Sequence, residues 1–164
     1  MNSRVVFDIR RAGPADAAAI AEVLRAAFSE YKALYTEGGF AATVLTPDEV
    51  IQRMSEGPVW VSLQNGTVAA TVAAAAKGES AYIRGMAAIP AARGCGVGTA
   101  LLHCVEDWAE EQGFTRLFLS TTPFLDSAIR LYENYGFHRM ESPSDLYGTP
   151  LFTMEKMLST HRRG

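Results

Sequence analysis

A glycine-rich loop between a strand pattern and a helix pattern limits the folds open to this chain more than any other feature. Residues 81–89 read as a strand that Pro90 ends, and the loop 93–99 (RGCGVGT) follows shortly after. Apolar residues at helical spacing then predict a helix over 99–112, and residues 117–119 predict a buried strand. A strand, a helix and a strand in succession require a crossover, so the two strands are expected to be parallel.

The segments before that loop predict an antiparallel meander. Val59–Gln64 and Thr67–Lys77 read as strands, and Asn65-Gly66 between them suits a tight turn in which both central residues take positive φ. A second turn at 78–80 leads into the strand 81–89. Further strands are expected at 5–10, 137–140 and 151–158.

Three further helices are predicted from their capping residues. Asp16 can cap a helix through residue 28, and Asp126 can cap one that ends at residue 135. Thr46, Pro47 and Glu49 form a strong helix start, with a capping box and proline at the first position. The elements together predict one α+β domain over residues 1–164, with helices on both faces of a mixed central sheet.

Length and charge exclude several classes of protein. The 164 residues suffice for one domain with a sizeable core, and a net charge of −3 gives no basic surface for nucleic acid. No apolar run approaches the ~20 residues that a membrane-spanning helix needs, and no signal-peptide core follows Met1. Cys95 and Cys104 make no disulfide framework and fit a reducing cytoplasm. We therefore expect a cytoplasmic protein that binds neither nucleic acid nor membranes, and a homodimer stays open.

The glycine loop has the properties of an anion-binding site. A helix start exposes unpaired N–H groups and the positive end of the helix dipole, and glycines let a phosphate approach the backbone. A Walker A loop would need a lysine before Thr99, and a Rossmann fingerprint would need one more residue before Gly98. A diphosphate is the natural ligand of such a loop, although a plain glycine-rich connection is the alternative.

Three stretches resemble the GNAT superfamily of N-acetyltransferases, and the likeness covers nearly the whole chain. The family's pyrophosphate motif is Gln or Arg, two residues, Gly, one residue, and Gly or Ala, which Arg93, Gly96 and Gly98 match. Residues 127–137 (SAIRLYENYGF) are similar to its last helix, with a tyrosine four residues before the glycine of Gly-Phe. Residues 151–158 resemble its closing strand.

The resemblance implies a fold, a cosubstrate and a reaction. The fold would be a GNAT-like single domain in which acetyl-CoA lies in a cleft where two parallel strands splay apart. A primary amine of a small molecule or a protein would attack the thioester directly in a ternary complex, and CoA would leave as a thiolate. Backbone groups of Met86, Ala87 and Ala88 would bind the pantetheine arm. The pyrophosphate loop would comprise Arg93, Gly94, Cys95, Gly96, Val97, Gly98 and Thr99.

The resemblance also makes Tyr132 the candidate general acid. Tyrosine titrates near 10 and a simple thiol near 8.5. A phenol close to the sulfur can therefore protonate or hydrogen-bond the departing thiolate. The residues alone favour a core tyrosine that packs the last helix beside Ile129 and Tyr135.

Two positions depart from the family pattern. Leu125 stands where the family often has an asparagine that helps to hold the cofactor, so a polar contact there must come from Asp126, Ser127 or the backbone. The strand 81–89 lacks the carboxylate that the family often uses as a base. The carboxylates nearest to that role are interpreted as solvated surface groups, and we assign no base. They are Glu79, Glu30 and Glu37.

Residues 29–42 show no clear period and are interpreted as a loop or irregular helix. Their aromatic and acidic side chains could line an amine pocket by cation–π and charge attraction, or could simply pin a long loop to the core. These residues are Tyr31, Tyr35 and Phe40, with Glu30 and Glu37.

No metal site is expected, and a function other than catalysis stays open. His103, His138 and His161 have no metal-ligand spacing, and Cys95 is interpreted as non-catalytic because a bound pyrophosphate would oppose its thiolate. The main interpretation is an acetyl-CoA-dependent N-acetyltransferase. The alternative is a non-catalytic acyl-CoA-binding sensor or interaction module, because a fold does not guarantee activity.

Overall fold

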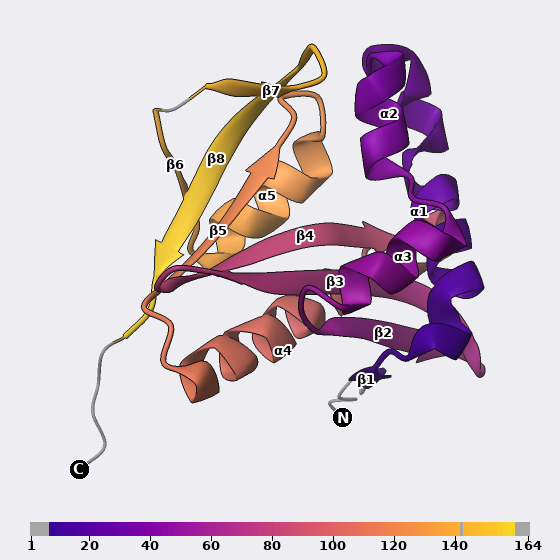
Figure 1. Ribbon diagram of the computed structural model, residues 1–164, viewed down its shortest axis with the longest axis horizontal. Coiled ribbons are helices and arrows are strands. Elements are labelled where there is room, and N and C mark those ends of the chain that lie inside the picture. Colours follow the sequence, from indigo (N-terminus) through magenta and orange to yellow (C-terminus); the bar gives the residue numbers. More distant parts are fainter. Residues whose placement is uncertain (1–6, 142, 160–164) are drawn as a thin grey trace, which may run out of the picture.

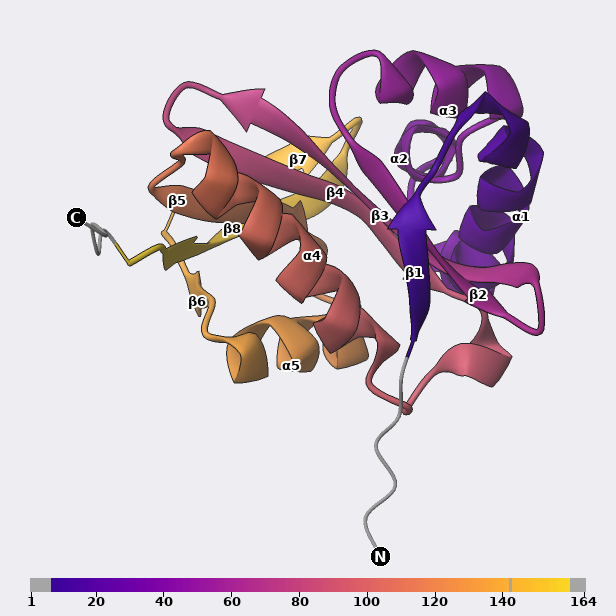
Figure 2. The ribbon, with the colours of Figure 1, turned by 90° about the horizontal axis from the view of Figure 1, so that it is seen from below.

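The computed structural model describes residues 7–141 and 143–159, and within them the chain forms one mixed sheet with helices on both faces (Figures 1 and 2). The strand order is β1-β2-β3-β4-β5-β8-β6, and β7 pairs with β8. The strands are β1 (Asp8–Arg11), β2 (Val59–Gln64), β3 (Thr67–Lys77), β4 (Ser80–Ala88), β5 (Arg116–Thr121), β6 (His138–Arg139), β7 (Ser144–Leu146) and β8 (Thr149–Met157). The helices are α1 (Ala17–Phe28), α2 (Glu37–Thr43), α3 (Pro47–Met54), α4 (Val97–Gln112) and α5 (Asp126–Tyr135), with short 3₁₀ turns η1 (Pro14–Asp16), η2 (Ser29–Leu34) and η3 (Pro90–Ala92).

The predicted meander and parallel pair are both confirmed. Strands β1 to β4 pair antiparallel in chain order, and β4 pairs parallel with β5 through the crossover helix α4. Asn65 and Gly66 have φ of 53° and 79° in the turn between β2 and β3, as the sequence predicts. The strand β7 was not predicted, and residues 5–6 of the expected first strand lie outside the described residues.

The parallel pair stays together for only three residues. β4 and β5 are in register at Ser80↔Arg116, Ala81↔Leu117 and Tyr82↔Phe118, and no pairing follows although both strands continue. Just past the last residue of β4 that pairs with β5, two residues of β4, Gly85 and Met86, lie opposite one residue of β3. Gly85 has a φ of +67°. Such a bulge bends a strand and increases its twist. Figure 1 shows β5 and β8 turning away from β4.

Each face of the sheet has its own apolar core. On one face α1 and α3 bury Leu24 and Val50 against Val61 of β2. On the other face α4 buries Leu102 and Val105 against the central strands. Helix α5 lies on the same side as α4 (Figure 2) and continues that core beyond the divergence.

The helix starts agree with the sequence only in part. Thr46 and Glu49 form the predicted capping box, with Glu49 N donating to Thr46 Oγ1 at 3.2 Å and Thr46 N donating to Glu49 Oε1 at 2.9 Å. Asp126 does not cap α5, because it is the first helical residue and Leu125 occupies the cap. Helix α4 begins two residues earlier than predicted, because Gly96 in the left-handed conformation turns the chain into the helix.

The irregular segment 29–42 forms η2 and then α2, and one threonine fastens it to the far side of the molecule. Thr36 caps α2 by accepting from Gly39 N, and its own N–H donates to Thr149 Oγ1 at 2.9 Å. Thr149 is buried at the start of β8. Helix α2 therefore lies beside the β7–β8 hairpin, where both can border a space above the sheet. No helix among the described residues has the length and apolar character needed to cross a membrane.

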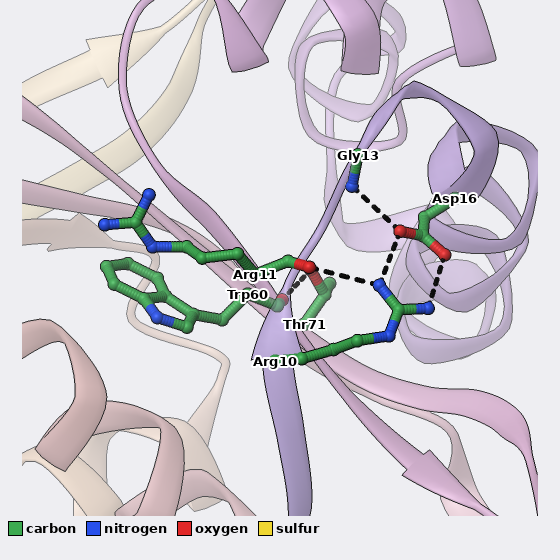
Figure 3. A network of polar contacts seen from close by, with 6 residues as sticks. All are labelled: Arg10, Arg11, Gly13, Asp16, Trp60 and Thr71. Carbon is green, nitrogen blue, oxygen red and sulfur yellow. Dashed lines mark hydrogen bonds and ion pairs between the residues drawn. The ribbon is translucent and has the colours of Figure 1, made fainter.

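Asp16 occupies the N-cap position of α1, as predicted, but its side chain makes no capping hydrogen bond, because the carboxylate binds Arg10 and Gly13 instead (Figure 3). It accepts two hydrogen bonds from Arg10, at 2.8 and 2.9 Å, and one from Gly13 N at 2.8 Å. These contacts close the turn between β1 and α1. The Arg10 guanidinium is the main reason that the pKa of Asp16 falls to about 2.

We expect Asp16→Asn to lower the free energy of unfolding by about 1–2 kcal/mol at pH 7. The folded pKa lies below the unfolded value near 3.9, so the contribution is present above about pH 4 and is lost as pH falls toward 2. Urea unfolding of both proteins at pH 7 and pH 3 measures the difference. The control is Glu22→Gln, which breaks an exposed ion pair with Arg25 and should change stability by less than about 0.5 kcal/mol. A deficit for Asp16→Asn that is equally large at both pH values would contradict the assignment.

Candidate functional site

A cavity of about 870 Å³ opens where β4 and β5 part. Its walls come from the bulged half of β4, the end of β5, the loop that starts α4, and α5. Parts of α1, η2, α2 and α3 close the opposite side, and Leu146 and Leu151 of the β7–β8 hairpin also contribute. The volume lies within the range of small-molecule and cofactor sites.

The glycine loop presents unpaired amides and open space to this cavity. Gly94 and Gly96 have φ of +80° and +93°, a backbone conformation that strongly favours glycine. An added Cβ at Gly94 would meet nothing within 4 Å, and one at Gly96 would meet only the Phe7 ring at 3.8 Å. The first amide bonded within α4 is that of Ala100, which donates to Gly96 O at 3.1 Å. The preceding amides at residues 97–99 are therefore available to a ligand.

The third glycine of the motif has a packing role. An added Cβ at Gly98 would lie 2.7 Å from Leu131 Cδ2, so glycine lets α4 and α5 approach closely at the cavity. Arg93 holds the other end of the loop. Its guanidinium donates to Glu30 Oε1 at 2.8 Å and to Ala27 O at 2.9 Å, which ties the loop to the end of α1. The Arg93 side chain thus positions the loop.

Met86, Ala87 and Ala88 line the cavity from β4. They lie past the last residue paired with β5, so the backbone edge that faces away from β3 has no strand partner there. An extended ligand can add to such an edge as another strand would. The structure thus brings together every predicted binding residue except Cys95, which is exposed, does not line the cavity, and has its Sγ 2.9 Å from Ala92 O.

Tyr132 reaches the cavity from α5 and is only 6% exposed. Its ring packs edge-on against Phe137 at 5.9 Å, so it is also part of the core. Among the described residues, no side chain or backbone group hydrogen-bonds its hydroxyl. Burial raises its pKa well above the usual value of 10, and the phenol stays protonated at neutral pH. Both interpretations of this tyrosine, core packing and a site residue, are therefore compatible with its position.

The carboxylates considered as bases do not reach the cavity. Glu30 is paired with Arg93, Glu37 is exposed in the first turn of α2, and Glu79 is exposed in the turn before β4. Tyr31 and Tyr35 do line it, and they pack on Phe124 with ring centroids 6.1 and 4.9 Å apart. Of the three aromatic residues considered for an amine pocket, Phe40 does not line the cavity, and neither do Glu30 and Glu37.

Several lining residues were missed from the sequence. Arg53 of α3 lies one turn after the buried Val50, and that helical spacing could have placed it on the inner face. Gly85 inside a strand is a recognisable sign of a bulge. Thr122, whose buried Oγ1 has no hydrogen-bond partner among the described residues, carries no such signal. Leu125 and Ser127 also line the cavity, whereas Asp126 does not.

The cavity wall is cationic. Its charged residues, within the part of the chain that the structure describes, are Arg53, Arg84, Arg93 and Arg130, and no aspartate or glutamate is among them. Over the same residues no cluster of His, Cys, Asp and Glu is suited to a metal ion, and His161 lies outside them.

Comparison with known proteins agrees with this geometry. The chain is 32% identical over 139 residues to the uncharacterized N-acetyltransferase YjgM of Escherichia coli strain K12, which covers 81% of this chain and 83% of that protein. The fold is similar to the PaiA N-acetyltransferase of Thermoplasma acidophilum in complex with coenzyme A, with a TM-score of 0.80, 17% identity, and coverage of 94% and 100% of the two chains. It is also similar to yncA of Salmonella typhimurium with its cofactor acetyl-CoA, with a TM-score of 0.73, 23% identity, and 98% coverage of both chains.

A family profile gives the assignment directly. The profile described as the acetyltransferase (GNAT) family matches residues 20–137, which include β2 to β4, the glycine loop and α5. The expected fold, with its meander and parallel pair, and the expected cosubstrate, acetyl-CoA, are both confirmed. The chain belongs to the GNAT family of acetyltransferases.

Proposed function

We propose that this acetyltransferase transfers the acetyl group of acetyl-CoA to a primary amine, by direct attack in a ternary complex. The observation that carries the proposal is that one continuous cavity joins the glycine loop, the free edge of β4 and Tyr132. A single cavity lets two substrates meet without a covalent enzyme intermediate. We further propose that residues 1–164 act as one domain, in the cytoplasm, where both free cysteines would stay reduced.

The residues of the loop and of β4 suit the two ends of the cosubstrate. The amides of residues 94–99 would hold the pyrophosphate at the positive end of α4, where positive-φ glycines leave room for it. Backbone groups of Met86, Ala87 and Ala88 would bind the pantetheine arm along the unpaired edge. Bound there, acetyl-CoA supplies an activated thioester for acyl transfer.

Tyr132 would assist departure of the thiol. A phenol with a raised pKa does not ionise at neutral pH, so it always has a proton to donate. Its free hydroxyl can hydrogen-bond the sulfur as negative charge develops there, and that interaction is stronger in the transition state than in the ground state. Its position on a helix packed against Phe137 fixes where the hydroxyl points.

The cationic wall suggests how the amine is deprotonated. No described residue in the cavity wall is a carboxylate or a histidine, so none can act as a conventional base. Guanidinium groups close to an ammonium disfavour its charged form and lower its pKa. We propose that the amine reacts as the free base and that its proton passes to water.

The alternative of a non-catalytic acyl-CoA sensor is supported by the same lack of a base and by Leu125 in the cavity wall. Release of free thiol from acetyl-CoA with a panel of primary amines tests between the two functions. The enzyme is expected to release thiol in proportion to acetylated amine. Binding of acetyl-CoA without thiol release for any amine would favour the sensor.

We expect Tyr132→Phe to lower kcat by about a hundredfold while the KM for acetyl-CoA changes little. The ring and its packing remain, and only the hydroxyl is lost. The matched control is Tyr135→Phe on the same helix. The Tyr135 hydroxyl donates to Glu106 Oε1 at 2.9 Å, and Tyr135 does not line the cavity. That control should retain wild-type kcat. Steady-state kinetics under conditions where chemistry limits the rate compare the three proteins, and an unchanged kcat for folded Tyr132→Phe would refute the role.

We expect Gly96→Val to weaken CoA binding by at least about tenfold, because a branched side chain at positive φ would distort the loop and obstruct the amides. Gly66→Val is the control, since Gly66 has a similar φ of +79° and open space around it but lies in the β2–β3 turn. Both variants should lose comparable thermal stability, and only the first should lose CoA affinity. Isothermal titration of the folded proteins measures this. Equal CoA affinities in both would place the phosphates elsewhere.

A further inference from the structure

Three of the four arginines that line the cavity lie at its two ends, and the fourth, Arg130, is exposed on α5. Arg93 belongs to the glycine loop and is paired with Glu30. Arg53 and Arg84 lie instead at the bulge of β4, where that strand has already parted from β5. The guanidinium of Arg53 lies over Gly85, with Nη1 only 2.6 Å from where a Cβ at that glycine would stand.

Arg53 has no counter-charge in contact with it. Among the described residues its guanidinium makes neither an ion pair nor a hydrogen bond, and Glu49 and Glu56 act on it only from a distance. Burial, together with repulsion from Arg84, lowers its pKa to about 10, so it is still a cation at neutral pH. A largely buried charge without a partner is costly, and such groups in proteins are normally paired.

Arg84 is only partly satisfied. It forms an ion pair with Glu56 through Nη2, while its Nε is buried without a hydrogen-bond partner among the described residues. The Tyr82 ring lies 5.8 Å from its guanidinium carbon. Two arginines and one paired glutamate leave one positive charge in excess at this end of the cavity, which matches a ligand with one negative charge.

This end of the cavity is also where the proposed acetyl transfer would occur, so the inference that follows depends on the proposed function. If the phosphates bind at the loop and the pantetheine arm follows β4 from Ala88 toward Met86, the thioester points toward Gly85. An anion held by Arg53 would then lie beside the reacting amine rather than on the nucleotide.

We propose that the acceptor is an amine that also bears a carboxylate, as a free amino acid does, and that the guanidinium of Arg53, next to Arg84, binds this carboxylate. Arginine is well suited to this, because its planar guanidinium matches a carboxylate in a bidentate arrangement. The remaining wall, with Phe28, Tyr31, Tyr35, Leu146 and Leu151, favours a bulky apolar side chain on that amino acid.

Phenylalanine and phenylalaninamide are a suitable acceptor pair, because they differ only in the carboxylate. Initial rates with saturating acetyl-CoA are compared per concentration of unprotonated amine, since the two amines titrate at different pH. We expect kcat/KM to favour phenylalanine by ~10–100-fold in the wild type. Arg53→Met should reduce that ratio to near one, and Arg53→Lys should retain part of it. The exposed Arg25→Met on α1 should keep the wild-type ratio.

Three outcomes would overturn the proposal. The first is that phenylalaninamide reacts as efficiently as phenylalanine, and the second is that the preference for phenylalanine survives in folded Arg53→Met. The third is an Arg53-dependent preference for succinyl-CoA over acetyl-CoA with a neutral amine, which would mean that Arg53 binds a carboxylate of the acyl group. Titration of N-acetylphenylalanine into the CoA-bound protein separates this proposal from the proposed function. Arg53-dependent binding without turnover of any amine would support the carboxylate site and contradict the proposed acetyl transfer. Turnover without any preference for a carboxylate would support acetyl transfer and contradict the carboxylate site.

Discussion

The early end of the β4–β5 pairing is the constraint on which the rest of this structure depends. Three paired residues hold the two strands together, and the bulge at Gly85 and Met86 then turns β4 away. Without that bulge, parallel pairing could continue to the ends of both strands and the cavity would be filled by sheet. The divergence therefore creates the space, leaves one edge of β4 unpaired, and aims that edge at the glycine loop, so a single backbone irregularity prepares three parts of the site.

The crossover helix α4 begins beside the cavity that the two diverging strands leave open. A right-handed connection from β4 to β5 must start at the end of β4, so the N-terminus of α4 lies at the mouth of the cavity. Its first residues line the cavity, so its free amides and the positive end of its dipole lie there. The three glycines of the loop have different tasks. Gly94 and Gly96 adopt positive φ, whereas Gly98 permits contact with Leu131 of α5, the helix that carries Tyr132.

Electrostatics distinguish the two ends of the cavity. At the loop, Arg93 is neutralised by Glu30, so backbone amides supply the positive potential. At the bulge, Arg53 and Arg84 outnumber their one paired carboxylate. A cavity with cations and no acids repels a bare ammonium. An amine that brings its own negative charge is attracted, because its carboxylate offsets the excess charge.

The sequence by itself determined the elements whose cause is local. The Asn65-Gly66 hairpin, the Thr46–Glu49 capping box, and the strand–glycine loop–helix–strand order follow from φ preferences, side-chain caps and chain connectivity, and all are present. The family motifs are also short local stretches of sequence, and the residues they pointed to, the glycine loop and Tyr132, line the cavity. Only the tertiary structure decided what depends on partners distant in the chain. It drew the Asp16 carboxylate to Arg10 instead of to a capping hydrogen bond, kept Glu30 and Glu37 out of the cavity, and placed Arg53 of α3 over Gly85 of β4. Such contacts join residues that no local pattern connects, so they are decided by how the helices pack across the twisted sheet.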